Sequence, residues 1–218
     1  MSDFTFKVYA KSKEELETKI RDANSRGYIL TRSGSYLRHY VSGDHRHWYA
    51  YLKEKGGVGM DEELTTLKRK IEYWSIAKGL HKSDTKVQGL KVIEEFSESL
   101  TAANTDDLID GIGDTYITLI ILSQQLQLDF AELKSKAEVT SCDLDNSLKA
   151  IRSFSSALSK NDIEGVKAAI ILIMSILETQ RIHFLKVRSL DCIRIAYDVI
   201  KYRKGKLVGG TFVKESDL

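Results

Sequence analysis

The chain has 218 residues, 42% of them hydrophobic and 29% charged, a globular balance that excludes a disordered or collagen-like chain. Its 33 basic and 31 acidic residues give a net charge of +2, so bulk charge gives no reason to expect a nucleic-acid partner. Cys142 and Cys192 lack CxxC spacing, which argues against a disulfide framework or a zinc site. The N-terminus lacks the apolar region of a signal peptide, and the apolar run 168–177 covers about half a membrane span. We therefore expect a cytoplasmic protein that does not enter a membrane.

The first sixty residues differ from the rest in charge and in pattern. Residues 1–60 carry 11 basic and 7 acidic side chains, a net charge of +4, and the remainder carries −2. Residues 4–9 alternate like a strand, residues 12–27 have the start and stop signals of a helix, and 28–40 with 47–52 resemble a hairpin around Gly43. The pattern predicts a small α+β module of βαββ order over residues 1–57.

Helical periodicity dominates the following residues, 58–218, and predicts a mainly α fold, a helical bundle with the small α/β module attached. The chain contains no proline, so helix ends must be set by glycine and polar caps. Residues 143–189 either form part of an insertion or supply a second half-bundle. The expected helices cover 61–78, 86–103, 106–125, 143–159, 161–180 and 187–204.

Acidic side chains gather on one face of each of two consecutive helices, 86–103 and 106–125. A short connection makes these helices antiparallel neighbours, so that the carboxylates can converge. Like charges four residues apart destabilise a helix by a few tenths of a kcal/mol, and a hard cation such as Mg²⁺ or Mn²⁺ would offset this cost. Gly111 and Gly113 would let a metal, a phosphate or a neighbouring helix approach. The carboxylates are Glu94, Glu95, Glu98, Asp107, Asp110 and Asp114.

The same pattern also fits ordinary solvated faces of amphipathic helices, because charged stripes opposite apolar stripes are common. Asp106 and Asp107 can equally be favourable charges at a helix N-terminus. Both interpretations stay open on the pattern alone.

The two acidic segments resemble a known family. Glu94-Glu95-x-x-Glu98, followed by Asp110-x-x-Gly-Asp114, is similar to the EExxE…ExxD signature of MazG-like nucleoside triphosphate pyrophosphohydrolases. Residues 71–80 resemble the first helix of these all-α enzymes, Gln88-x-x-Lys91 matches a QxxK motif ahead of the glutamates, and 196–214 resembles the C-terminal segment of phage-encoded members.

The chain departs from the family pattern at three places. The first Glu of ExxD would fall on Gly111, so Asp110 must replace it, and helical geometry permits this because i and i+4 share a face. The family often has Asn where this chain has Asp198. The helical insertion at about 127–189 is longer than the usual connection, and the N-terminal module lies outside the resemblance.

The resemblance implies Mg²⁺-dependent (or Mn²⁺-dependent) hydrolysis of the α–β phosphate bond of an NTP or dNTP, giving the monophosphate and pyrophosphate. It also implies a homo-oligomer, a dimer or a tetramer, that helps to control a nucleotide pool, in the host cytoplasm if the chain is phage-encoded. Glu94 and Glu95 are the candidate catalytic residues. The candidate metal ligands are Glu94, Glu95, Glu98, Asp110 and Asp114. The candidate substrate-binding residues are Trp74, Gln88, Lys91, Asp198, Lys201, Arg203 and Lys204.

Some of these roles have alternatives. Trp74 fits a core aromatic better than a base-stacking one, and Arg203 can face the phosphates together with Lys201 only if the last helix ends before it. A non-catalytic nucleotide- or protein-binding regulator with the same fold is the alternative function. Two groups of residues in the hairpin have a simpler explanation than binding. For the histidines and Asp44 we favour an exposed hairpin over a metal site, and for the basic and aromatic residues we favour half-buried sheet packing over a surface for single-stranded nucleic acid. They are His39, Asp44, His45 and His47, and Arg32, Arg38, Arg46, Tyr36, Tyr40, Trp48 and Tyr49.

Overall fold

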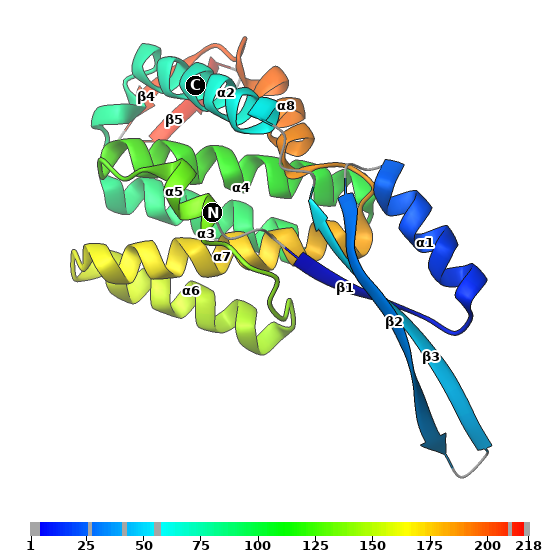
Figure 1. Cartoon of the computed structure of the whole chain (residues 1–218). Coiled ribbons are helices and arrows are strands. Elements are labelled where there is room, and N and C mark those ends of the chain that lie inside the picture. The colour runs from blue at the N-terminus through cyan, green and yellow to red at the C-terminus, as the bar shows by residue number, and fades with distance from the viewer. Residues whose placement is uncertain (1–4, 26–27, 41–42, 55–57, 209–210, 216–218) are drawn as a thin grey trace. The chain divides into compact units, whose positions relative to one another are not determined.

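The computed structural model describes residues 5–25, 28–40, 43–54, 58–208 and 211–215 (Figure 1). The chain is mainly helical, as the sequence predicts. It divides into two compact units, Met1–Asp61 and Glu62–Leu218, whereas the predicted boundary lies after residue 57.

The first unit joins an antiparallel sheet to one helix. The central strand β3 begins at Gly43, earlier than the predicted residue 47, and pairs with both β1 and β2. The helix begins with a capping arrangement, because the amide of Glu15 donates to Ser12 Oγ at 3.0 Å and that of Lys11 donates to Glu15 Oε2 at 2.9 Å. Its elements are β1 (Thr5–Ala10), α1 (Lys13–Ser25), β2 (Tyr28–Tyr40) and β3 (Gly43–Glu54).

The hairpin candidates lie on β2 and β3, whose backbone pairing sets Tyr36 opposite His47 and His39 opposite Asp44. The side chains of residues 22–61 lie outside the described part of the chain. A metal site or a nucleic-acid surface on this hairpin therefore stays a prediction.

The second unit is a set of helices with a short hairpin at its end. Helix α5 and this hairpin were not predicted from the sequence. The last helix, predicted to reach residue 204, is α8 and ends at Ile200. The elements are α2 (Val58–Ala77), the 3₁₀ turn η1 (Leu80–Lys82), α3 (Thr85–Thr101), α4 (Thr105–Gln125), α5 (Phe130–Ser135), α6 (Leu144–Ser159), α7 (Ile163–Phe184), α8 (Ser189–Ile200), β4 (Gly205–Val208) and β5 (Thr211–Lys214).

Short polar side chains set the helix starts in this proline-free chain. At each of five N-termini a carboxylate or amide oxygen accepts a hydrogen bond from a backbone N–H of the first turn, which otherwise lacks a partner. These caps agree with the expectation that polar residues replace proline in marking boundaries. They are Asp84, Asn104, Asp129, Asp143 and Asp162.

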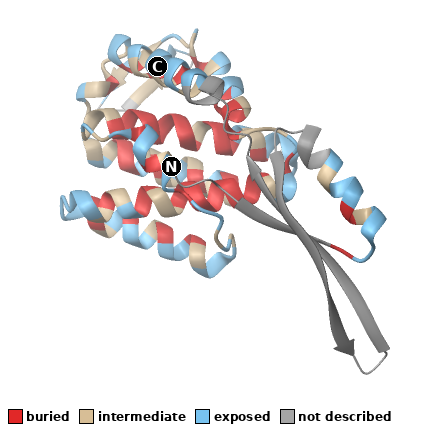
Figure 2. Ribbon diagram, viewed as in Figure 1, coloured by how far each residue is buried: buried red, intermediate tan, exposed pale blue. Residues whose placement is uncertain are grey.

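Helix α4 is the centre of the second unit and is buried along most of its length (Figure 2). Two of its glycines permit close contacts with neighbouring helices. A Cβ on Gly111 would lie 2.9 Å from backbone atoms of Ser99 in α3, and one on Gly113 would lie 2.5 Å from the carbonyl oxygen of Cys192 in α8. Of the three roles expected for these glycines, the structure shows the approach of neighbouring helices.

A buried ionic network joins α4, α5 and α7. The hydroxyl of Tyr116 donates to Glu178 Oε1 at 2.7 Å, Lys134 Nζ donates to the same oxygen at 2.8 Å, and Arg181 Nε donates to Glu178 Oε2 at 2.8 Å. Burial alone would raise the pKa of Glu178, but the two cations outweigh it and hold the pKa well below its usual range. The carboxylate is therefore fully compensated, which a buried charge requires.

Among the described residues, no single helix is long and apolar enough to cross a membrane. Helices α7 and α8 reach that length and composition only as a pair, which bends by 101° at its junction.

We expect Gly113→Ala to destabilise the protein by about 1–3 kcal/mol, because the added methyl group must push α8 away from α4. The sign of this change in stability distinguishes a crowded position from an open one, because in an uncrowded helix the substitution of glycine by alanine stabilises the protein by about 1 kcal/mol. Urea unfolding measures the change, with Ser155→Ala on the exposed side of α6 as the control. A Gly113→Ala variant as stable as the parent would contradict the close α4–α8 contact.

Candidate active site

Helices α3 and α4 bring the predicted carboxylates together. We call Glu94, Glu95, Glu98, Asp110 and Asp114 the acidic cluster. Only residues 102–104 separate the two helices, and the contact at Gly111 holds their backbones close. Within the cluster the Glu95 side chain is 12% exposed and the Glu94 side chain is 54% exposed, so the cluster has an inner and an outer part.

Burial and neighbouring negative charges raise the pKa of two carboxyl groups in the cluster. Burial, followed by the negative charges of Asp110, Glu95 and Glu98, raises the pKa of Asp114 to about 7. Burial, followed by Glu95 and Glu94, also raises the pKa of Glu98. The cluster therefore carries more negative charge than its surroundings compensate, which is a typical property of functional sites.

Lys91 is the cation nearest to the outer part of the cluster. Its Nζ atom lies 2.8 Å from Glu94 Oε2 and 3.1 Å from Glu95 Oε1. Burial lowers the pKa of Lys91, but the two glutamates outweigh this effect and the pKa rises. Lys91 thus balances part of the charge that a metal ion would balance.

The donor chemistry of the cluster fits a hard divalent cation, because all five side chains offer carboxylate oxygens and repel one another. In the part of the chain that the structure describes, no three Asp, Glu, His or Cys side chains stand close enough together to hold an ion. In this arrangement Lys91 contacts Glu94 and Glu95, two of the candidate ligands.

Arg203 approaches the cluster from the C-terminal segment. Helix α8 ends at Ile200, and the amide of Arg203 then donates to the Ile200 carbonyl oxygen at 2.9 Å. Lys78 Nζ holds the carbonyl oxygen of Arg203 at 2.8 Å. The guanidinium lies near enough to lower the pKa of Asp114, although burial and the neighbouring carboxylates outweigh it. Helix α8 therefore ends before Arg203, which is the condition that the predicted role of Arg203 beside Lys201 requires.

Trp74 packs beneath the C-terminal hairpin. Its ring meets Phe212 of β5 edge-on, with 5.8 Å between centroids, and Lys78 Nζ lies 5.5 Å from the centre of the Phe212 ring. The Trp74 side chain is half-buried, and this contact with Phe212 does not decide between a core aromatic and a base-stacking one.

The remaining candidates have partners of their own or lie at the surface. The buried Gln88 amide donates to the Thr118 carbonyl oxygen at 3.1 Å and so joins α3 to α4. Asp198 and Lys201 pair with each other at 2.7 Å on α8, and Lys204 is exposed just beyond Arg203. Asp107 receives a hydrogen bond of 2.8 Å from the Asn104 amide, as expected for a residue at a helix start.

Sequence reasoning did not identify Lys78 as part of this region. Its role depends on contacts with Arg203 and Phe212, which lie more than a hundred positions later in the chain. The available signal was weak, a single lysine at the end of a helix, where cations are favourable in any protein.

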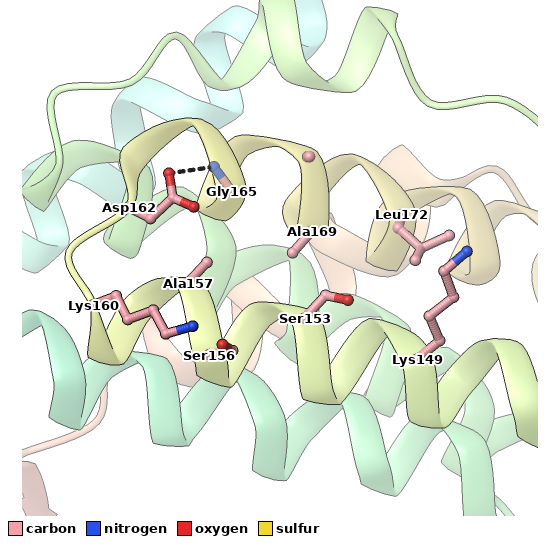
Figure 3. A pocket seen from close by; sticks show the side chains of 10 residues that line it. Lys149, Ser153, Ser156, Ala157, Lys160, Asp162, Gly165, Ala169 and Leu172 are labelled. Carbon is pink, nitrogen blue, oxygen red and sulfur yellow. Dashed lines mark hydrogen bonds between the residues drawn. The ribbon is translucent and has the colours of Figure 1, made fainter.

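A groove of about 370 Å³ runs between α6 and α7 (Figure 3). Its one carboxylate, Asp162, accepts a hydrogen bond of 3.0 Å from the Gly165 amide and so caps α7. Lys149 and Lys160 reach along the groove, and most of the other lining residues are small. This arrangement lacks the convergent acids and bases of the acidic cluster, which is therefore the better candidate for chemistry.

No family model, curated protein or solved structure matches this chain. The functional assignment must therefore come from the residues and their geometry.

We expect Asp114→Asn to raise the free energy of unfolding at pH 8 by about 1–2 kcal/mol and to change it little below pH 4. Because the pKa of Asp114 is raised to about 7, the folded chain keeps a proton that the unfolded chain loses between about pH 4 and 7, so stability falls with rising pH in that window. The side-chain amide of asparagine does not titrate in this pH range, so Asp114→Asn removes this loss of stability.

Urea unfolding in metal-free buffer across this pH range measures the difference. Asp106→Asn, at an exposed aspartate in the first turn of α4, is the matched control and should give no gain at pH 8. A pH-independent effect of Asp114→Asn would contradict the raised pKa of Asp114 in the folded chain.

Proposed function

We propose that this protein is a MazG-like nucleoside triphosphate pyrophosphohydrolase that hydrolyses the α–β phosphate bond of an NTP or dNTP. The observation that carries the proposal is the convergence of the acidic cluster with Arg203, which sets uncompensated carboxylates beside a cation suited to phosphate. The order of the acidic motifs along α3 and α4 supports it further. The helical second unit would then be a bundle of the type found in that family.

Glu95, Glu98, Asp110 and Asp114 would hold Mg²⁺ or Mn²⁺, with Glu94 at the outer edge. When bound, the metal neutralises the triphosphate and polarises the phosphorus under attack. Arg203 would bind phosphate oxygens, and Lys91, released from Glu94, would add a second positive charge. These residues orient the triphosphate so that a water molecule can attack the α-phosphorus in line with the leaving pyrophosphate.

Glu95 is the better-placed general base of the two catalytic candidates, because it is mostly buried and acts electrostatically on both Asp114 and Glu98. It accepts a proton as the water oxygen forms its bond to the α-phosphorus. The bond from that phosphorus to the bridging oxygen breaks, and the bond electrons leave with pyrophosphate. The products are a nucleoside monophosphate and pyrophosphate.

The proposed setting is a nucleotide pool in the cytoplasm, or in the host cytoplasm if the chain is phage-encoded. The resemblance of the C-terminal segment to phage-encoded members suggests purine deoxynucleotides or an alarmone-type nucleotide as candidate substrates. Base selection depends on a few contacts that helical patterns do not reveal. We also propose that the protein acts as a homo-oligomer.

The direct test is a panel of the eight common NTPs and dNTPs with Mg²⁺, scored separately for pyrophosphate and orthophosphate. We expect pyrophosphate from a subset of the panel, and Glu95→Gln should lower the rate by about 10²–10⁴-fold because the proton acceptor is lost. Glu164→Gln, at an exposed glutamate paired with Lys167 on α7, should leave the rate unchanged.

Orthophosphate as the first product would refute α–β cleavage. A Glu95→Gln variant as active as the parent would refute the assigned base. Thermal unfolding with and without Mg²⁺ accompanies the assay, since a bound metal should stabilise the parent by up to about 2.7 kcal/mol at a concentration a hundred times its Kd.

We expect Arg203→Ala to reduce kcat/KM by about 10–100-fold through the loss of a charged phosphate contact. Arg203→Lys should retain part of the activity, because it keeps the charge but not the two-pronged geometry. Lys206→Ala, at an exposed position on β4, is the control, and steady-state kinetics on the preferred substrate measure all three variants. Equal losses at positions 203 and 206 would indicate general attraction of anions instead of a positioned contact.

A non-catalytic nucleotide- or protein-binding regulator is the second candidate function. It is favoured by the pairing of Lys91 with both Glu94 and Glu95, which already compensates part of the charge that a metal would meet. Thermal stabilisation by nucleotide without any product would support this function over hydrolysis.

A further inference from the structure

The groove between α6 and α7 has two walls of different chemistry (Figure 3). The α6 wall is polar, and its side chains follow one another at intervals of four, three and four residues, so they share one strip of the helix. The α7 wall consists of small or apolar residues. The α6 wall contains Lys149, Ser153, Ser156 and Lys160, and the α7 wall contains Gly165, Ala168, Ala169 and Leu172.

The two lysines carry charge that the groove does not balance. Among the residues that the structure describes, neither Lys149 nor Lys160 has an ion-pair partner, whereas Lys167 on the outside of α7 pairs with a glutamate. The carboxylate of Asp162 caps α7 and offsets at most one of the two charges. Residues 146–161 contain three basic and no acidic side chains. The α6 wall therefore attracts an anionic partner.

The two serines of the α6 wall have free hydroxyls. Ser155 and Ser159, which do not line the groove, donate to carbonyl oxygens of their own helix at 2.8 and 2.9 Å. Within the described ranges, the hydroxyls of Ser153 and Ser156 have no such partner. Ammonium and hydroxyl donors on one wall thus face an apolar wall across the groove, which suits a partner with an acidic side and an apolar side.

The spacing of the lysines favours a long partner that is itself helical. Lys149 and Lys160 lie at opposite ends of the groove (Figure 3). Eleven positions make about three turns, or about 16.5 Å, of α-helix and return to the same side. Two carboxylates eleven positions apart on another helix have the same spacing. The small side chains of the groove also let a third helix approach the pair closely.

We propose that the groove between α6 and α7 binds an acidic, amphipathic helix of another protein. Two carboxylates of that helix pair with Lys149 and Lys160, and apolar side chains between them contact Ala169 and Leu172. Both walls lie within residues 127–189, outside the acidic cluster on α3 and α4. The proposal is therefore independent of the hydrolytic function.

Fluorescence anisotropy of a labelled peptide, titrated with the full chain, tests the proposal. The peptide is an alanine-rich helix with two glutamates eleven positions apart and leucines between them on the same side. We expect saturable binding with a Kd on the order of 10 µM, and binding at least about tenfold weaker when glutamine replaces both glutamates. Absence of saturation at about 1 mM, or equal binding of the glutamine peptide, would overturn the proposal.

Charge reversal tests the two ion pairs. Lys149→Glu and Lys160→Glu should each raise the Kd of the glutamate peptide by at least about tenfold, because each sets like charges opposite one another. Lys70→Glu, at an exposed position on α2, makes the same change in net charge and should alter Kd by less than about twofold. A peptide with lysine in place of both glutamates should bind the double variant to within about threefold of the parent Kd. Failure of this exchange would overturn the pairing.

A bulky side chain in the groove tests the site without changing its charge. Ser153→Phe should weaken binding of the glutamate peptide at least about tenfold, because the ring fills the space that the partner needs. Ser155→Phe, on a side of α6 that does not line the groove, is the matched control. Both serines are exposed, so far-UV circular dichroism should report native helix content in both variants.

Binding that survives Ser153→Phe would place the peptide elsewhere and overturn the proposal. Self-association of the chain without peptide, abolished by the same substitution, would assign the groove to a second copy and would overturn it too.

Discussion

The close contact of α4 with two neighbouring helices is the constraint on which the candidate site depends. Gly111 brings α3 against one side of α4, and Gly113 brings α8 against another. The first contact brings the glutamates of α3 together with Asp110 and Asp114, and the second carries the end of α8, and therefore Arg203, to the same place. A side chain at either glycine would push α4 away from a neighbouring helix and so separate these groups.

The buried carboxylate of Glu178 and the acidic cluster differ in how their charge is compensated. Glu178 has Lys134, Arg181 and the Tyr116 hydroxyl within hydrogen-bond distance, so its charge is fully balanced inside the protein. In the acidic cluster Lys91 pairs with Glu94 and Glu95, and burial together with the neighbouring carboxylates raises the pKa of Asp114 although the Arg203 guanidinium lowers it. The first arrangement stabilises the fold. The second keeps unbalanced charge ready for a ligand, which distinguishes a candidate site from a structural ion pair.

Patterns within a single helix were predictable from the sequence, and contacts between distant segments were not. Apolar periodicity located the major helices, and helical spacing identified the acidic face of α3 and α4 because both signals depend on near neighbours. The end of α8 at Ile200 was missed because no proline or glycine marks it there. The position of Lys78 and the network around Glu178 were also missed, since each joins segments that are far apart in the chain.

Lys78 holds the main-chain oxygen of residue 203 and makes no use of the side chain at that position. The backbone is therefore anchored beside the acidic cluster whatever residue occupies position 203. Evolution or protein engineering can consequently exchange the group presented there, for a lysine, a glutamine or an aromatic residue, without rebuilding the segment that carries it. A substitution at position 203 therefore changes the chemistry of the side chain beside Asp114 and keeps the hydrogen bond that holds this segment to Lys78.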